Sequence, residues 1–241
     1  MRCVSVYNGP PIKINGYKLV SKIKSLSLEL HLYLLKGSSP RCIKLYKPCY
    51  TAFMRKIIVT EFISTDGVME GPGPDDPFKF AGWTMAYGSA ETMKIKLNEV
   101  MESDALLLGR TTYDGFAKAW PGRNDEMGFG DKMNSMKKYV VSDTLKTADW
   151  SNTEIIAGKD LVEKLTALKN KEGGDILVNG SSVLVKSLSD NNLVDVYRLL
   201  VFPIILGTGK RLFNGNNKIE LTLVKSQSFD NGVIFLEYST K

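Results

Sequence analysis

Apolar segments of strand length alternate with segments of helical periodicity along most of this 241-residue chain. Residues 105–108 and 175–178 are almost continuous apolar runs, and residues 56–63 and 138–142 are similar runs with few polar positions. Strands that are apolar on both faces are typical of a parallel sheet that helices cover on both sides. The chain is therefore predicted to form an α/β domain with a mostly parallel sheet.

The first predicted helix begins near Ser89 and would place Met93, Leu97, Val100 and Met101 on one face. Further helices are expected to begin near residues 109, 161 and 181. The pattern changes toward the C-terminus, where strands are predicted without helices between them, over residues 194–206, 220–229 and 233–238. The Asn-Gly pair between the last two strands is typical of a hairpin turn, so the sheet is expected to end in antiparallel strands.

Charge divides the chain near Met54. Residues 1–53 hold nine of the 32 Lys and Arg residues and one of the 26 acids, which gives them a net charge of +8. The remaining 23 bases and 25 acids give residues 54–241 a net charge of −2. We therefore predict a basic extension over residues 1–53, disordered or outside the fold, and one domain over residues 54–241. A transit peptide, a membrane-surface segment and translation from Met54 are the alternatives for the extension.

Residues 54–241 contain neither cysteine nor histidine. Their absence excludes Ser–His–Asp and Cys–His catalysis, the usual zinc sites and disulfide bonds from this part of the chain. We expect no metal site and a reducing, cytoplasmic location. No apolar run approaches the roughly 20 residues that cross a bilayer, so no membrane partner is expected. If this part is an enzyme, an organic cofactor is expected to supply the demanding chemistry.

Glycine and hydroxyl residues follow three of the predicted strands. They are residues 109–112 (GRTT), Ser142 and residues 179–182 (NGSS). Each group alone is common at turns and helix caps. In a parallel sheet, however, the carboxyl ends of the strands share one edge, and helices that begin there offer backbone N–H groups to phosphates. Together the three groups predict a site for a ligand with several phosphates, such as NADPH.

Five motifs that follow one another along the chain carry a family resemblance. They are STDG (64–67), LLGRTTY (107–113), LVNGSS (177–182), LVD (193–195) and PIILGTGKRLF (203–213). With them the chain resembles the dihydrofolate reductase superfamily, and within it the reductase domain of the bifunctional riboflavin-pathway deaminase-reductase and its stand-alone relatives. The resemblance implies a three-layer α/β/α fold with a mixed, mostly parallel sheet and antiparallel C-terminal strands.

The resemblance also implies NADPH as the hydride donor. The implied cofactor-binding residues are Gly109, Arg110, Thr111, Thr112, Ser142, Asn179, Gly180, Ser181 and Ser182. The first four would lie by the phosphates and the adenosine ribose, and Ser142 near the adenosine end. Gly180 and the two serines after it would bind the pyrophosphate. Asn179 replaces a glycine of the family, and the turn can survive because asparagine tolerates left-handed backbone.

Four further positions are implied to face the substrate. Asp66 and Gly67 open the loop that resembles the family's mobile loop over nicotinamide and substrate, and Trp83 is a candidate cover, with core packing as the alternative. Val178 stands where riboflavin-pathway reductases have a substrate-binding glutamate, which argues against their substrate. Asp66 and Glu91 are the candidate catalytic acids, although Glu91 could instead complement a helix N-terminus.

The favoured hypothesis is an NADPH-dependent reductase that transfers a hydride to a small heterocyclic, carbonyl or imine substrate, pterin-like or riboflavin-precursor-like. The alternative is a non-catalytic NADP-binding or sensing protein of the same fold. A nucleic-acid partner is not expected, because only residues 1–53 are strongly basic. A homodimer is expected, because the C-terminal strands leave an edge that a monomer must protect.

Overall fold

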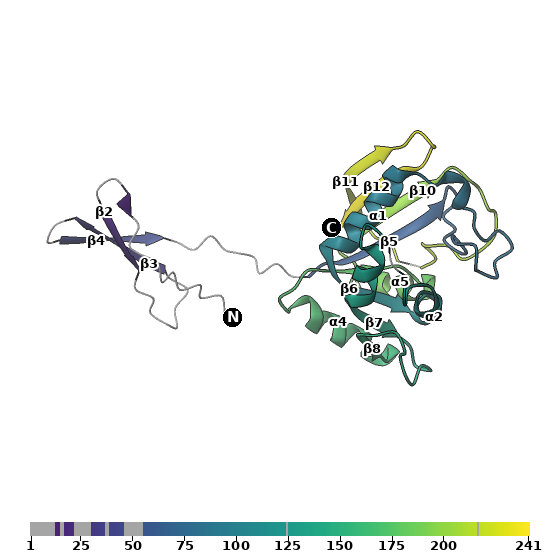
Figure 1. Cartoon of the computed structure of the whole chain (residues 1–241), viewed down its shortest axis with the longest axis horizontal. Coiled ribbons are helices and arrows are strands. Elements are labelled where there is room, and N and C mark those ends of the chain that lie inside the picture. The colour runs from purple at the N-terminus through teal and green to yellow at the C-terminus, as the bar shows by residue number, and fades with distance from the viewer. Residues whose placement is uncertain are drawn as a thin grey trace. The chain divides into compact units, whose positions relative to one another are not determined.

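The computed structural model describes strands within residues 13–45 and the chain from residue 55 to 241, except positions 124 and 216. The chain divides into two units, Met1–Ala52 and Phe53–Lys241. In the first, four antiparallel strands form a sheet in the order β1-β2-β3-β4 (Figure 1), with the bounds β1 (Lys13–Ile14), β2 (Tyr17–Ser21), β3 (Leu30–Lys36) and β4 (Ser39–Leu45). The other residues of this unit lie outside the described ones, and the prediction for residues 1–53 stays a prediction.

The second unit is built on an eight-stranded sheet in the order β11-β12-β10-β5-β9-β6-β7-β8. The six strands from β10 to β8 are parallel, whereas β12 and β11 are antiparallel. The prediction of a mixed, mostly parallel sheet with antiparallel C-terminal strands is confirmed. The strands are β5 (Ile57–Ser64), β6 (Ser103–Gly109), β7 (Lys137–Val141), β8 (Thr153–Ile156), β9 (Asp175–Val178), β10 (Val196–Phe202), β11 (Leu221–Ser228) and β12 (Ile234–Thr240).

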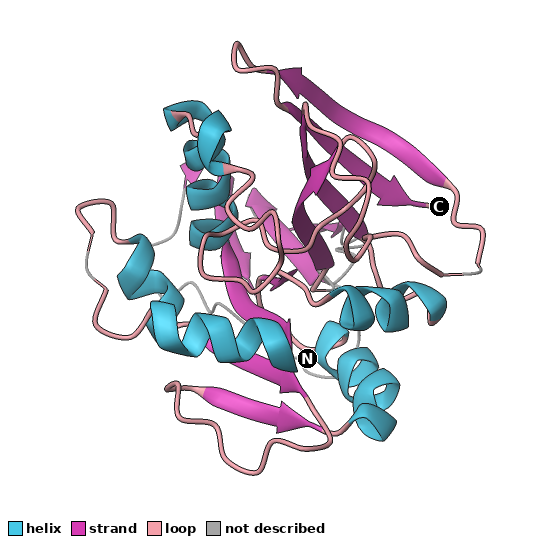
Figure 2. Ribbon diagram, turned by 90° about the vertical axis from the view of Figure 1, so that its right-hand side faces the viewer, coloured by secondary structure: helices cyan, strands magenta, loops and turns pink. Residues whose placement is uncertain are grey.

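Helices cover both faces of this sheet (Figures 1 and 2). The α-helices are α1 (Ala90–Glu102), α2 (Arg110–Ala119), α3 (Phe129–Ser135), α4 (Leu161–Lys169) and α5 (Ser182–Asp190). Two single 3-10 turns are η1 (Met85–Tyr87) and η2 (Gly158–Asp160). Among the helices that the structure describes, none is long and apolar enough to span a membrane.

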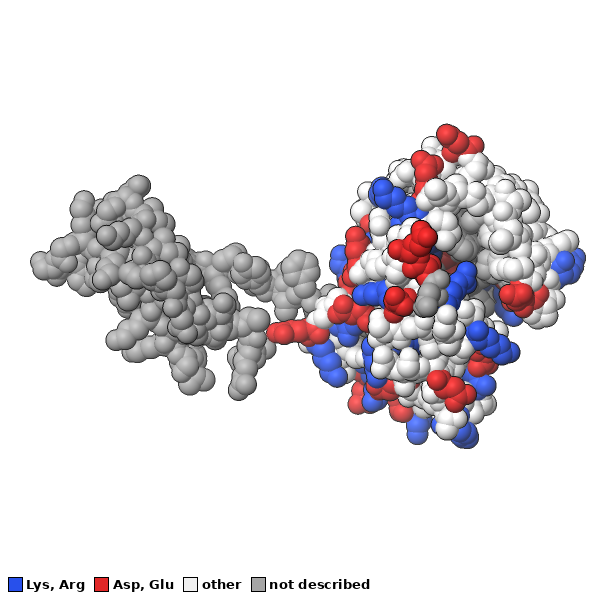
Figure 3. Space-filling model, viewed as in Figure 1, with Lys and Arg blue, Asp and Glu red and all other residues white. Residues whose placement is uncertain are grey.

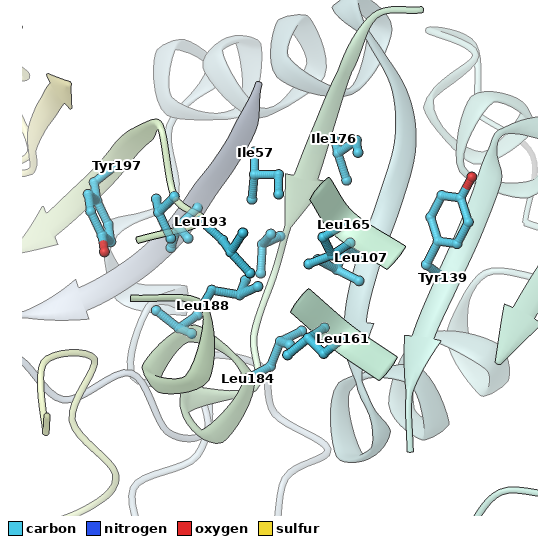
Figure 4. Packing of buried hydrophobic residues seen from close by; sticks show 14 of the residues in the cluster. Ile57, Leu107, Tyr139, Leu161, Leu165, Ile176, Leu184, Leu188, Leu193 and Tyr197 are labelled. Atoms are coloured by element: carbon cyan, nitrogen blue, oxygen red, sulfur yellow. The ribbon is translucent and has the colours of Figure 1, made fainter. Parts of the chain in front are cut away.

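The core forms two layers because successive residues of the central strands point to opposite faces. On one face, Ile57 and Leu107 pack with Leu165 of α4 and Leu188 of α5 (Figure 4). On the other, the neighbouring strand positions pack against α1, α2 and α3, which contribute Val100, Tyr113 and Met133. Burial on both faces is the reason that these strands are almost continuously apolar.

The apolar face predicted for the first helix is buried only in part, at Val100. Helix α1 does begin where expected, because Ser89 caps it and accepts a hydrogen bond from the N–H of Thr92 (3.2 Å). However, Met93 and Met101 are exposed, whereas Thr92 and Glu99 are buried. The sheet-facing stripe of α1 is therefore partly polar, and the apolar spacing of the methionines misled the prediction.

Candidate functional site

Two glycines bring the ends of β6 and β9 into contact at the carboxyl edge of the sheet. Gly109 at the end of β6 donates its N–H to the carbonyl oxygen of Gly180 (3.0 Å). A Cβ atom on Gly109 would collide with Ser181 Oγ and lie 2.8 Å from the Ser181 nitrogen. A Cβ atom on Gly180 would lie 3.0 Å from Thr112 Oγ1. The structure therefore brings together four of the predicted cofactor residues, and glycine permits their close approach.

Helices α2 and α5 both begin at this contact. Gly109 is the N-cap of α2 and Ser181 is the N-cap of α5, and neither cap makes a side-chain hydrogen bond to its helix. The N–H groups of both first turns thus lack the usual capping acceptor, and the positive ends of two helix dipoles lie close together. Such an arrangement suits a ligand with more than one phosphate.

Arg110 extends from the first turn of α2 and is paired within the helix. Its Nε donates to both carboxylate oxygens of Asp114, at 2.9 and 2.7 Å. Both side chains remain about two-fifths exposed, so this is a surface pair of the kind that contributes a few tenths of a kcal/mol. An incoming phosphate could therefore displace Asp114 at little cost.

Ser142 follows β7 at the same edge of the sheet but serves a local turn. Its Oγ accepts hydrogen bonds from the N–H groups of Thr144 (3.2 Å) and Leu145 (3.0 Å). Its own N–H is donated to the carbonyl of Ile156. The hydroxyl can still donate its proton to a ligand.

Asp66 links the loop that follows β5 to the loop that follows β10. Its carboxylate accepts from Ser64 Oγ (2.7 Å) and from the N–H groups of Leu206 (3.1 Å) and Gly207 (2.9 Å), and it faces Arg211 at 3.4 Å. The hydrogen bond from Ser64 lowers the pKa of Asp66 to about 2, with the two backbone N–H groups acting in the same direction. An ionised and occupied carboxylate of this kind cannot supply a proton at neutral pH.

The other predicted catalytic and substrate residues occupy core, turn or surface positions. Trp83 is buried, packs edge-on against Phe202 (5.3 Å between ring centroids) and donates its Nε1–H to the carbonyl of Glu70 (2.8 Å). Val178 is fully buried in the core on the α4 and α5 face. Glu91 is exposed on the outer face of α1. Gly67 has a φ of +80° and forms the turn that returns to Ser64.

Strand β5 is left without a neighbour on one side near the site. β9 pairs with β5 only from Ile57 to Val59, whereas β10 continues to pair with β5 as far as Ser64. The carbonyl of Lys56 accepts a hydrogen bond from the N–H of Ile176 in β9. The carbonyl of Ile57 accepts one from the N–H of Asp195, just before β10. By the alternation of backbone groups along a strand, the N–H and C=O of Phe62 are directed to the side where β9 has ended. They offer one donor and one acceptor on this open side of β5.

The sequence analysis missed Glu61, which lies on this unpaired part of β5. Its Oε1 atom is buried without a hydrogen-bond partner and would be 3.6 Å from a Cβ atom on Gly180. Burial raises the pKa of Glu61 to about 8; the charge of Lys96 opposes this shift and that of Glu99 adds to it. An acid inside an otherwise apolar strand was the signal that could have identified it.

A cluster of polar side chains from α1 and β5 lies close enough to Glu61 to act on its charge. Lys96 Nζ contacts Glu99 Oε2 (2.8 Å) and donates to Thr60 Oγ1 (2.5 Å), and Thr60 donates in turn to Glu99 Oε2 (2.7 Å). Lys96 also lies over the ring of Phe62, 5.3 Å from its centroid. This cluster joins α1 to β5 and sets the charge around Glu61.

A cavity of about 240 Å³ lies elsewhere, at the opposite end of β10. It is lined by the end of α5, the start of β10 and the last residues of the chain, including Tyr197 and Lys241. It contains none of the predicted site residues.

Comparison with known proteins agrees with this architecture. The family model described as the RibD C-terminal domain matches residues 55–235. The chain belongs to the RibD C-terminal domain family. In this RibD C-terminal domain, the glycine-containing junctions at Gly109 and Gly180 follow the carboxyl ends of β6 and β9.

Three relatives of this RibD C-terminal domain illustrate the range of similarity. The uncharacterized protein YyaP of Bacillus subtilis is 29% identical over 188 residues, which are 76% of this chain and 94% of YyaP. A putative riboflavin biosynthesis protein from Shewanella sp. PV-4 has a TM-score of 0.58 at 19% identity, over 77% of this chain and 99% of that one. Dihydrofolate reductase from Enterococcus faecalis, solved with NADP(H), has a TM-score of 0.53 at 14% identity, over 78% and 98%. The two solved structures establish the shared fold.

Proposed function

We propose that residues 55–241 form an NADPH-dependent reductase that reduces a C=N or C=O bond of a small heterocyclic substrate. The observation that carries this proposal is the meeting of two uncapped helix N-termini across Gly109 and Gly180, beside the unpaired part of β5. The family membership and the NADP(H) complex of the Enterococcus reductase support it.

The residues at the sheet edge fit the parts of such a cofactor. The first turns of α2 and α5, with Thr112 and Ser181, would bind its phosphates, and Gly180 would let the pyrophosphate approach the backbone. The N–H and C=O of Phe62 would pair with a carboxamide group. When bound, NADPH supplies the hydride, and the chain supplies orientation and exclusion of water.

The substrate class follows from what surrounds Gly180. Val178 is buried in the core, so the chain has no carboxylate at the position where riboflavin-pathway reductases bind their pyrimidine. We therefore favour a pterin-like or quinonoid substrate over a riboflavin precursor. Oxidation of NADPH in the presence of pterins, flavin precursors and quinonoid carbonyl compounds tests this. Tight NADPH binding without oxidation by any of them would instead support the non-catalytic alternative.

Arg110 is proposed to read the 2′-phosphate that distinguishes NADPH from NADH. Arg110→Ala should weaken NADPH binding by about 1.5–3 kcal/mol, the scale of a charge-assisted hydrogen bond, and leave NADH binding almost unchanged. The matched control is Asp114→Asn, which removes the negative charge that now holds Arg110 Nε and should not weaken NADPH binding. Equal weakening of both cofactors by Arg110→Ala would show a purely structural role.

We also propose that the protein is a homodimer that uses the outer strand of the sheet. β11 is an edge strand, and Leu223 and Val224 on it are more than half exposed. Such an edge is a liability unless it is covered. Light scattering should give twice the mass of one chain. Val224→Lys should reduce the measured mass to that of a single chain. A monomer mass for the unmodified chain at micromolar concentration would contradict this proposal.

A further inference from the structure

We propose that Glu61 is the catalytic acid of this site and gives a proton to the substrate atom next to the carbon that accepts the hydride. This inference rests on the proposed reductase function and adds the proton donor that the sequence analysis left unassigned. Two geometric observations carry it, which are the position of Glu61 and the lack of a hydrogen-bond partner for its buried Oε1, and the direction of its pKa shift supports them.

Glu61 is positioned where a substrate would meet the cofactor. It lies two residues beyond the last β5 residue that pairs with β9, where one side of the strand is open. Its Oε1 would be 3.6 Å from a Cβ atom on Gly180, and the Met69 methyl would be 3.5 Å from the same point. Glu61 therefore borders Gly180 and directly precedes Phe62, whose N–H and C=O are proposed to pair with the carboxamide at the nicotinamide end of the cofactor.

The carboxyl group of Glu61 has no structural task in the described part of the chain. No hydrogen bond links it to a described residue, although its Oε1 is buried, and an unpaired buried oxygen is costly. Glu99 also has a buried oxygen without a partner, its Oε1, but Thr60 and Lys96 both bind its Oε2 and tie it into the packing of α1. Glu61 as a whole residue retains some exposure to solvent, whereas its Oε1 is buried.

The raised pKa of Glu61 keeps most of its carboxyl protonated near pH 7, so that it carries the proton to be given. Burial raises its pKa to about 8, and Lys96 and Glu99 of α1 are the charged groups that act on it, in opposite directions. A pKa close to the working pH suits general acid catalysis. After the proton has left, the positive charge of Lys96 stabilises the remaining carboxylate.

The proton transfer balances without any group beyond those proposed. The carbon of the C=N or C=O bond gains the hydride and forms a C–H bond, while its π-electron pair moves to nitrogen or oxygen. That atom takes the proton from the Glu61 carboxyl, so one O–H bond breaks and one N–H or O–H bond forms. Glu61 is left as a carboxylate and regains a proton from water before the next turnover.

The first test measures the protonation of Glu61 in the protein without ligands. The chain is labelled with 13C at glutamate side-chain carboxyls and titrated by NMR, and Glu61→Gln identifies the resonance that belongs to Glu61. We expect this resonance to titrate near pH 8, and Glu99→Gln to move its midpoint to lower pH because a negative neighbour is removed. Titration of Glu61 near its ordinary value of 4.5 would overturn the proposal.

The second test measures turnover with whichever compound of the substrate panel consumes NADPH. Glu61→Gln should lower kcat by about 100-fold or more, remove the alkaline fall of kcat near pH 8, and leave the Kd for NADPH unchanged. The matched control is Glu102→Gln at the exposed end of α1, which should match the unmodified chain. Circular dichroism establishes that each variant is folded. Glu61→Asp keeps a carboxyl group but places it farther from the substrate, because the side chain is one methylene group shorter, and should give an intermediate kcat.

The outcomes separate the two proposals. If NADPH does not bind, or binds and is never consumed, the reductase function fails and the catalytic role of Glu61 fails with it. If NADPH is consumed and Glu61→Gln retains its kcat, the reductase function stands and only the role of Glu61 is wrong.

Discussion

Replacing Glu61 by glutamine should stabilise the protein in a pH-dependent manner. The pKa of Glu61 is about 8 in the folded chain and about 4.5 when exposed. Between these values the folded state holds a proton that the unfolded state has lost, so stability falls as the pH rises. The slope is about 1.4 kcal/mol per pH unit, and the full 3.5 units give an upper limit of about 5 kcal/mol. Glutamine is neutral throughout and removes this dependence.

Urea unfolding followed by tryptophan fluorescence at pH 5, 6.5 and 8 provides the assay. Glu61→Gln should match the unmodified chain near pH 5 and exceed its free energy of unfolding by about 2–5 kcal/mol at pH 8. Other titrating groups cancel in this difference, and Glu102→Gln should show no pH-dependent difference. A stability difference that stays constant from pH 5 to pH 8, or a variant less stable than the unmodified chain at pH 8, would refute the reasoning.

Three further predictions concern the sheet edge, the joined loops and the extension. Gly109→Ala should cost about 1–3 kcal/mol of stability in urea unfolding and abolish NADPH binding, because its Cβ would collide with Ser181; Gly115→Ala, where a Cβ meets nothing within 4 Å, is the control and should do neither. Asp66→Asn should lower the melting temperature at pH 7 but hardly at pH 2, because the stabilisation from a lowered pKa is present above pH 3.8 and is lost as the pH falls toward 2; equal loss at both pH values would contradict it. A chain that begins at Met54 should keep its melting temperature and NADPH affinity, and a large loss of either would show that residues 1–53 belong to the fold.

The sheet and its ligand-facing edge were predictable because they follow from local rules. Continuous apolar strands indicate burial on both faces, and parallel strands place their carboxyl ends together. From these rules alone, Gly109 and Gly180 are expected at one edge, and the structure joins them by a hydrogen bond of 3.0 Å. The agreement arises because each rule depends on a few neighbouring residues and on one general property of parallel sheets.

The details that depend on distant partners were not predictable in the same way. The methionines of α1 have helical spacing, yet Thr92 and Glu99 are buried, the first bonded to the cap residue Ser89 and the second to Thr60 of β5. Helix α3 was not predicted at all, since it is short and its start is organised by Asp125, which accepts from the N–H groups of Phe129 and Gly130. In both cases a polar partner, rather than an apolar periodicity, decides the local structure.

Three acids have been considered as the proton donor, and they differ in their surroundings. Asp66 and Glu91 were predicted from the sequence, and Glu61 is proposed from the structure. Asp66 has hydrogen-bond donors on both oxygens, which hold it as a carboxylate. Glu91 is exposed to solvent on α1. Glu61 has neither donors nor full solvation, and it therefore retains its proton at a cost in stability above pH 4.5. A short motif records the identity of an acid but not these surroundings, and only the surroundings decide whether it can give a proton at neutral pH.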